Sequence, residues 1–124
     1  MSTTSTIALQ HADGTITAVY VHWDGYPSGV GQTLVDHHST PQKVTDLLAL
    51  GNISSLGDDL QTTQYYGRDM GREDKGAIAY NCTAQSADWA QGDYNYIWLD
   101  NRWMIWDNFT EDAQGDLQPL DDFL

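Results

Sequence analysis

The residues with the clearest potential for chemistry are four histidines, some of which stand close to aspartates. They are His11, His22, His37 and His38. Imidazole and carboxylate groups are common metal ligands, and Asp24 and Asp36 lie near in the sequence. However, no two histidines have the i, i+4 spacing of a helical metal site, and the adjacent His37 and His38 would point about 100° apart on a helix. We therefore predict no metal site and no cofactor.

Nucleophilic catalysis has equally little support. Ser28 follows a predicted strand, but Tyr26 stands where the Gly-x-Ser-x-Gly motif of many hydrolases needs its first glycine. Cys82 has no basic neighbour that would favour its thiolate. The glycines of residues 25–31 are not followed by the Lys-Ser/Thr pair of a phosphate-binding loop. We therefore predict that the protein is not an enzyme.

A polar cluster is a more specific hypothesis. His22, Asp24 and Tyr26 lie on one predicted loop, and Arg68 and Asp69 lie on another. Residues 66–75 hold three of the five basic residues of the chain. If the two loops meet and the cluster opens to solvent, it would bind a small molecule or a peptide. If it is closed, it would be a structural lock, with the guanidinium bidentate to a carboxylate.

Charge is the most unusual property of the chain. Eighteen acidic residues against five basic ones give a net charge of −13, and sixteen of the acids are aspartate. Nucleic-acid binding needs clustered lysine and arginine, so direct binding to nucleic acid is excluded, and anionic membranes are disfavoured. Three explanations compete for this surplus of negative charge: it keeps the protein soluble, it adapts the protein to a high-salt habitat, or it imitates nucleic acid toward a basic target. Having only two glutamates argues against the second explanation.

Under the third explanation, carboxylates would stand where a basic host protein or nucleoprotein complex normally binds phosphates. The candidate binding residues are Asp58, Asp59, Asp107, Glu111, Asp112, Asp116, Asp121 and Asp122.

The sequence also indicates the cellular compartment in which the protein is expected. Cys82 is the only cysteine, so no intrachain disulfide can form and a reducing compartment is expected. Residues 1–6 have neither the positive charge nor the apolar stretch of a secretory signal, and no segment approaches about 18 apolar residues. We expect a cytoplasmic protein.

Patterns in the first half predict two strands and two helices. Strands are expected at 7–11 and 16–23, joined by a turn at Asp13-Gly14, with the Val19 side of the second strand facing the core. Ser28 would cap a helix over 29–38. A second helix would begin at Thr40 with Pro41 in its first turn and end at Gly51.

The second half is less regular until its aromatic segment. We expect a turn at 52–57, a strand within 58–66, a short apolar run at 77–80 and a helical turn at 86–92. The clearest hairpin signal is 94–99 followed by 102–107, in which Trp98 would face Trp103. Both faces of this hairpin are apolar, so both should be covered.

These elements predict an α+β fold: an antiparallel sheet of at least four strands in two hairpins, with two helices packed on one face. Residues 1–5 would be a disordered N-terminus, 6–107 a single domain, and 108–124 an acidic C-terminal tail pinned by apolar residues. An alternative use of the hairpin is a homodimer interface. It would be built from Tyr94, Tyr96, Trp98 and Trp103.

Four segments together resemble a group of small uncharacterised proteins encoded by bacteriophages, prophages and mobile elements. They are residues 20–27, 50–56, 66–71 and the aromatic hairpin. The shared pattern is Y-x-HWDGYP, then LGxISSL, then YGRDxG. The resemblance implies a genomic setting rather than a mechanism, and the acidic tail lies outside it. With the charge, it favours an accessory protein in the bacterial host cell that inhibits a CRISPR or restriction complex as a DNA mimic. The alternative is a small-molecule or nucleotide sponge that uses residues 22–26 and Arg68.

Overall fold

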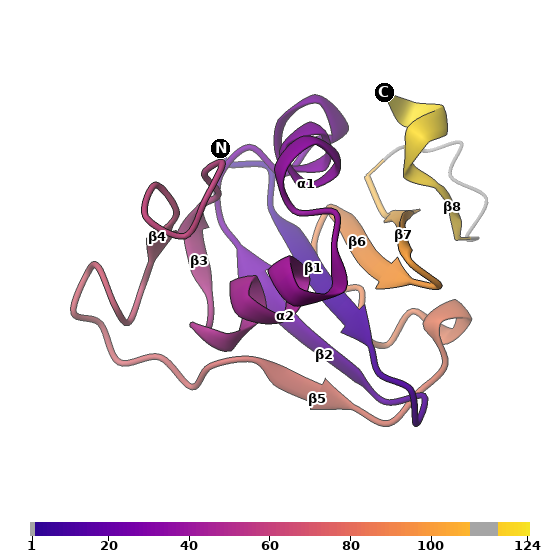
Figure 1. Ribbon diagram of the computed structural model, residues 1–124, viewed down its shortest axis with the longest axis horizontal. Helices are drawn as coiled ribbons and strands as arrows, with labels where there is room; N and C mark the ends of the chain where they lie inside the picture. The colour runs from indigo at the N-terminus through magenta and orange to yellow at the C-terminus, as the bar shows by residue number, and fades with distance from the viewer. Residues whose placement is uncertain (1, 110–116) are drawn as a thin grey trace.

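The computed structural model describes residues 2–109 and 117–124. Within them, eight strands form one sheet in the order β4-β3-β2-β1-β6-β7-β8, with β5 also paired to β2 (Figure 1). The strands are β1 (Ser5–Gln10), β2 (Ile16–Val21), β3 (Ile53–Ser55), β4 (Gln64–Tyr65), β5 (Ile78–Tyr80), β6 (Tyr94–Leu99), β7 (Arg102–Asp107) and β8 (Gln118–Pro119).

The two predicted hairpins are confirmed. Strands β1 and β2 pair antiparallel, as do β6 and β7. In the second hairpin Trp98 faces Trp103, as the two-residue turn predicted. Both turn residues have positive φ, 55° at Asp100 and 61° at Asn101. That is the conformation of the turn whose twist matches the flanking strands.

The α+β class and a sheet of at least four strands are confirmed, but the sheet is mixed rather than antiparallel throughout. Strand β1 runs parallel to β6, and β2 runs parallel to β3. Parallel neighbours cannot be joined by a tight turn and need a long crossover connection. Residues 22–52, which contain the helices, form the crossover between β2 and β3. Residues 22–93 form the longer connection between the first hairpin and the second. No residue pattern inside the strands distinguishes these arrangements.

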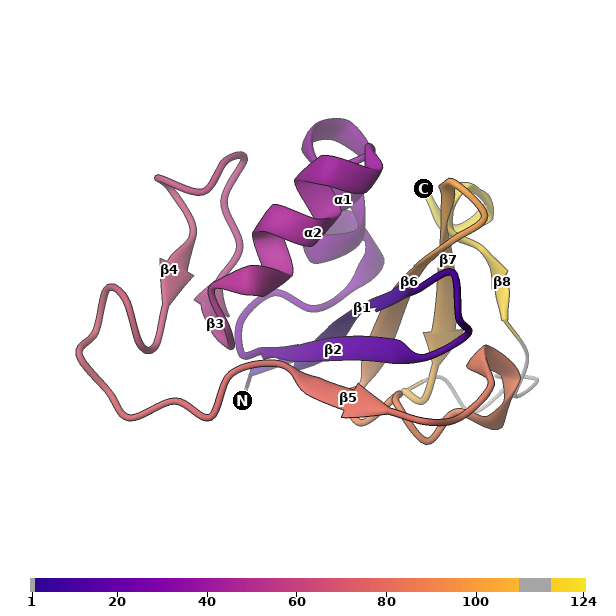
Figure 2. The same cartoon turned by 60° about the horizontal axis from the view of Figure 1, so that its bottom comes forward.

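Two helices cover one face of the sheet, as predicted (Figures 1 and 2). A helical turn η1 (Pro27–Gly31) leads into α1 (Gln32–His37), and α2 (Pro41–Ala49) follows. Thr40 caps α2 by accepting a hydrogen bond from the Lys43 backbone N–H. The prediction that Ser28 caps α1 is wrong, because Ser28 lies inside η1, which has no side-chain cap.

The helix-side core is built from both hairpins and both helices. Its residues include Ile7, Val19, Val21, Leu34, Val44, Leu47, Tyr96, Trp98, Trp103 and Ile105. Val19 and Val21 therefore face the core as expected, but Trp23, assigned to the same face, is 48% exposed. The chain's own core buries Tyr96, Trp98 and Trp103, so these side chains are not available to a dimer interface.

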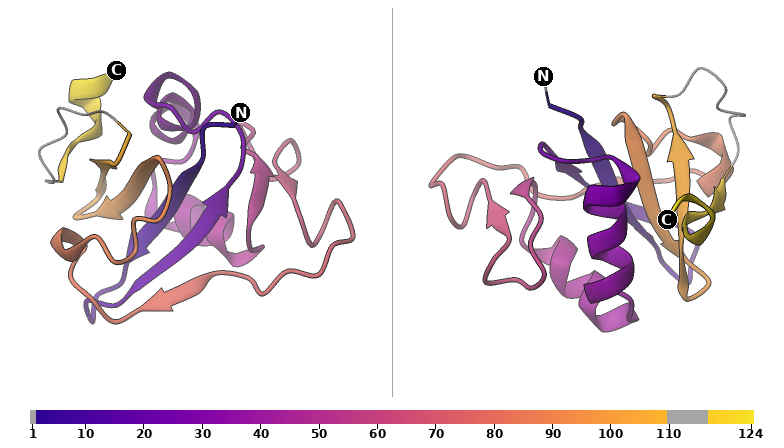
Figure 3. Two further views of the ribbon diagram at one scale, coloured as in Figure 1. Left: turned by 180° about the vertical axis from the view of Figure 1, so that it is seen from behind. Right: turned by 90° about the horizontal axis from the view of Figure 1, so that it is seen from above.

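A second core lies on the opposite face of the sheet. It contains Ala8, Ile16, Ala18, Ala84, Trp89, Ala90, Ile97 and Met104. Seen from behind (Figure 3), β5 and the segment after it, which includes the short turn η2 (Ala84–Ser86), lie on this side. Both faces of the aromatic hairpin are therefore covered, as the sequence predicted.

The remaining differences concern the middle and the ends. A strand, β3, stands where a turn was expected, and only two residues of 58–66 form the strand β4. Ser5 lies in β1 rather than in a disordered N-terminus. Part of the expected tail belongs to the domain, because β8 pairs with β7 and Leu120 of the turn η3 (Leu120–Phe123) is fully buried. Neither helix within the described ranges has the length or apolar character needed to cross a membrane.

Candidate functional site

The first half of the predicted polar cluster forms local contacts. The Tyr26 hydroxyl donates to Asp24 Oδ1 at 3.1 Å. His22 Nδ1 lies 2.6 Å from the Tyr20 hydroxyl, and its ring meets that of Trp23 edge-on at 4.6 Å between centroids. This loop is held mainly by backbone, since the Val30 N–H donates to the Asp24 carbonyl at 2.9 Å.

The second half forms a separate lock. Arg68 donates from Nε and Nη2 to the two carboxylate oxygens of Asp69, both at 2.9 Å, and also to the Leu60 and Thr63 carbonyls. Asp69 accepts from the Tyr65 N–H as well. The Arg68 hydrogen bond is the largest of the effects that hold the pKa of Asp69 below its usual value. Among the described residues, no hydrogen bond or ion pair joins this lock to His22, Asp24 or Tyr26, so each half acts locally.

The predicted acidic residues fall at several places. Asp58 and Asp59 lie on the loop before β4, and Asp121 and Asp122 lie on η3. Asp121 lines a hollow with Val35 of α1, so these two groups flank α1 on the helix side of the sheet (Figure 2). Asp107, in contrast, ends β7 opposite Tyr94. The other three candidates, Glu111, Asp112 and Asp116, lie outside the described residues.

Carboxylates elsewhere have local structural roles. Asp13 accepts from the N–H and hydroxyl of Thr15 in the first turn, and Asp93 accepts from Thr4. Asp74 accepts from the N–H and side chain of Asn52 and from the Gly76 N–H. Burial disfavours ionisation of Asp74, but these hydrogen bonds outweigh it and its pKa is lowered. The negative charge is therefore not confined to one face.

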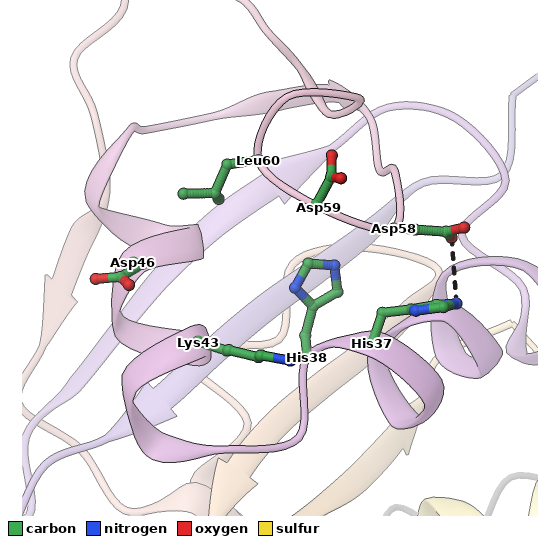
Figure 4. Close-up of a pocket in the computed structure, with 7 residues that line it drawn as sticks. All are labelled: His37, His38, Lys43, Asp46, Asp58, Asp59 and Leu60. Carbon is green, nitrogen blue, oxygen red and sulfur yellow. Dashed lines mark ion pairs between the residues drawn. The ribbon is translucent and has the colours of Figure 1, made fainter.

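The most site-like feature of the acidic helix side is a pocket of about 200 Å³ between the α1–α2 connection and the loop before β4. Its lining residues are His37, His38, Lys43, Asp46, Asp58, Asp59 and Leu60. Figure 4 shows the His38 ring in the middle, with Lys43 and Asp46 of α2 on one side and Asp59 and Leu60 of the loop on the other. We call this the His38 pocket.

His38 joins the pocket to the core. Its side chain is almost completely buried, with 3% of the residue exposed. Nε2 lies 3.0 Å from the Gly57 carbonyl, which can only accept, so Nε2 carries the proton. The His38 carbonyl accepts from the Trp103 indole at 3.1 Å. Burial lowers the pKa of His38, an effect partly opposed by the Gly57 hydrogen bond, so the ring is held neutral.

Short contacts hold the opposite wall of the pocket. Asp59 Oδ1 accepts from the N–H and hydroxyl of Thr62, at 2.8 and 2.9 Å. The Thr63 hydroxyl donates to the Asp59 carbonyl and accepts from the Gly57 N–H. Asp58 Oδ1 lies 3.5 Å from His37 Nε2, a contact that is an ion pair when the imidazole is protonated. The loop is thus braced, and its carboxylates stand at the rim.

This arrangement presents three carboxylates, two imidazoles and the Lys43 ammonium around a partly apolar hollow. Because the carboxylates outnumber the ammonium, the pocket suits a cation rather than an anion. Within 2–109 and 117–124, no group of three or more His, Cys, Asp or Glu residues could hold a metal ion. The sequence identified Asp58 and Asp59, but it considered His37 and His38 only as metal ligands. It missed Lys43 and Asp46, although their i, i+3 spacing on an amphipathic helix places them on one exposed face.

Burial of His38 predicts a pH effect on stability. An unfolded histidine takes up a proton near pH ~6.5, whereas folded His38 resists protonation because burial lowers its pKa. Below that pH the unfolded state binds more protons than the folded state. The folded state therefore keeps its full stability above about pH 6.5 and loses stability as the pH falls below it. His37, Lys43 and Asp58 are the charged groups that act on the ring.

Urea unfolding between about pH 7.5 and 5.5 should show this decline. The control is His38→Gln, which keeps an amide N–H for the Gly57 carbonyl but cannot titrate. Its stability should vary less over the same range, and an equal slope in both proteins would contradict the assignment to His38.

No protein-family model, no curated protein and no solved structure matches the chain.

Proposed function

We propose that the protein is a non-catalytic binding protein whose acidic helix-side face contacts a basic, nucleic-acid-binding partner. We define this face by the exposed carboxylates of α1, α2 and the loop before β4, which are Asp36, Asp46, Asp58 and Asp59. The observation that carries the proposal is the composition of residues 32–63, in which these four exposed carboxylates are accompanied by one lysine, Lys43, and no arginine.

The geometry supports binding to a folded partner. The carboxylates are carried by α1, α2 and a loop braced by its own hydrogen bonds, so little ordering is needed on association. Bonds within the chain do not remove charge: Asp36 and Asp46 accept from the Gln32 and Gln42 amides and stay exposed. A fixed array of negative charge accelerates and orients the approach of a basic surface.

The partner class proposed from the resemblance is a host CRISPR or restriction complex in the bacterial cytoplasm. The protein would act as an accessory factor of a phage or mobile element and occupy the partner's nucleic-acid-binding surface. Support comes from net charge and small size, since a carboxylate array and a phosphate backbone attract the same lysines and arginines.

Competition with nucleic acid tests the proposal. A partner captured from host lysate at low salt should release fluorescent duplex DNA when the protein is added, and its affinity for the protein should fall steeply as salt rises. Replacing both Asp36 and Asp46 by asparagine should weaken binding about three- to tenfold, because two interfacial charges are lost.

The matched control is Glu73→Gln with Asp88→Asn, which removes the same charge from exposed positions outside this face. It should change the affinity much less. Equal losses in both double variants, binding insensitive to salt, or a partner that binds DNA and the protein together would each contradict the proposal.

A further inference from the structure

The His38 pocket presents a hydrogen-bond acceptor that the chain does not use. Because Nε2 donates to the Gly57 carbonyl, the other ring nitrogen, Nδ1, is an acceptor in the neutral ring. No hydrogen bond joins Nδ1 to a described residue, and Nδ1 is not among the buried atoms that lack a partner, so it opens onto the pocket. Nδ1 lies on the side of the ring that faces α2, toward Asp46 (Figure 4). An acceptor that faces a pocket can receive a hydrogen bond from a ligand that brings an N–H group.

The walls of the pocket specify the rest of that ligand. Part of the lining is apolar, and Leu60 is the apolar residue among the seven that line the pocket. The carboxylates of Asp46, Asp58 and Asp59 surround it. A side chain with an apolar stem and a positively charged end matches this pattern, because it packs its stem and keeps its charge near carboxylates.

We propose that the His38 pocket receives an arginine side chain of the basic partner. This inference rests on the proposed function and names the contact that anchors it. The planar guanidinium has five N–H donors, so it serves both the imidazole Nδ1 and the carboxylates at the rim, and it stacks on flat rings better than an ammonium does. Only the neutral imidazole accepts at Nδ1, so burial of His38 preserves the acceptor.

Lys43 acts as an internal competitor. Its ammonium lines the same pocket and makes no hydrogen bond or ion pair with the described residues. It therefore contributes a positive charge that an incoming guanidinium must tolerate. Removing that charge leaves the carboxylates and the His38 ring in place.

Titration with a defined peptide tests the proposal. The probe is a short peptide of arginine, glycine and serine, compared with a lysine version of the same charge and a version with citrulline, which has the same shape without the charge. Affinity is measured by calorimetry, and the imidazole nitrogens of His38 are followed by long-range ¹H–¹⁵N NMR. We expect the arginine peptide to bind best and to shift the Nδ1 signal of His38.

Variants sharpen the test. Asp58→Asn should weaken the arginine peptide about three- to tenfold, and Lys43→Met should strengthen it. Asp88→Asn, which removes the same charge from an exposed position outside the pocket, is the control and should change little. Three results would overturn the proposal that the pocket binds arginine. They are an unmoved His38 signal, equal binding of the arginine and citrulline peptides, and equal effects of Asp58→Asn and Asp88→Asn.

The two proposals fail differently. If the peptide binds in a salt-dependent way without moving the His38 signals, the acidic face stands and the pocket does not. If the lysine peptide binds as tightly as the arginine peptide, selection of a guanidinium is refuted. If no basic peptide binds the folded protein at low salt, both proposals fall.

Discussion

Replacing Trp89 by alanine is expected to lower the free energy of unfolding by about 3–5 kcal/mol. Trp89 is fully buried in the second core, and its indole N–H donates to the Ala84 carbonyl at 2.8 Å. The substitution leaves a large cavity and an unpaired buried carbonyl. Since a domain of this size has about 5–15 kcal/mol in total, the variant should be close to unfolding. Urea unfolding followed by far-ultraviolet circular dichroism measures the loss.

The chain supplies a matched control in Trp23. This residue is 48% exposed, and its ring meets the His22 ring edge-on. Trp23→Ala should cost about 1 kcal/mol or less, as surface substitutions do. Similar losses at the two positions would show that the segment after β5 does not cover the sheet as the structure has it.

Replacing Gly25 by alanine is expected to destabilise the protein by about 1–3 kcal/mol through overpacking. An added Cβ would lie 2.6 Å from the Thr4 carbonyl oxygen and 2.8 Å from that of Thr3, both backbone atoms that cannot rotate away. Gly25 is also held on both sides: its N–H donates to the Thr3 carbonyl, and its carbonyl accepts from the Tyr96 hydroxyl at 2.6 Å. The segment before β1 should loosen, which amide hydrogen exchange would detect.

Gly67→Ala is the corresponding control. Its nearest neighbour would be Asp74 Cβ at 3.6 Å, an ordinary contact, and its φ is not in the left-handed region. Its stability should stay within about 0.5 kcal/mol of the parent protein. If Gly25→Ala were tolerated equally well, the close packing of the N-terminal segment against residues 22–31 would be refuted.

The parts of the fold that the sequence predicted depend on short-range signals. Thr40 and Pro41 begin α2 because a hydroxyl acceptor and a residue without an N–H suit the first helical turn. Asp100 and Asn101 tolerate positive φ, so they determine the register of the aromatic hairpin. Apolar residues occupy both sets of alternate positions in 94–107, which predicted that both faces would be covered. Each of these signals operates within a few residues.

The parts that the sequence left open depend on contacts between distant segments. Strand β3 forms because Ile53 pairs in parallel with Val21 of β2. It has only three residues, which is too short for a periodic pattern that would predict a strand from the sequence. The sequence predicted a bidentate guanidinium–carboxylate pair in this segment, but not that Arg68 would pair with the adjacent, exposed Asp69. The other partners of Arg68, the Leu60 and Thr63 carbonyls, follow from the path of the loop.

The sequence alone determined that the protein is acidic and has two hairpins and two helices, because charge and local conformational preference belong to residues and their immediate neighbours. Only the tertiary structure decided which carboxylates surround one pocket and that His38 is buried there with one nitrogen engaged. Those properties arise when the α1–α2 connection meets a loop about twenty residues further along the chain, and the free energy of that meeting comes from the whole core.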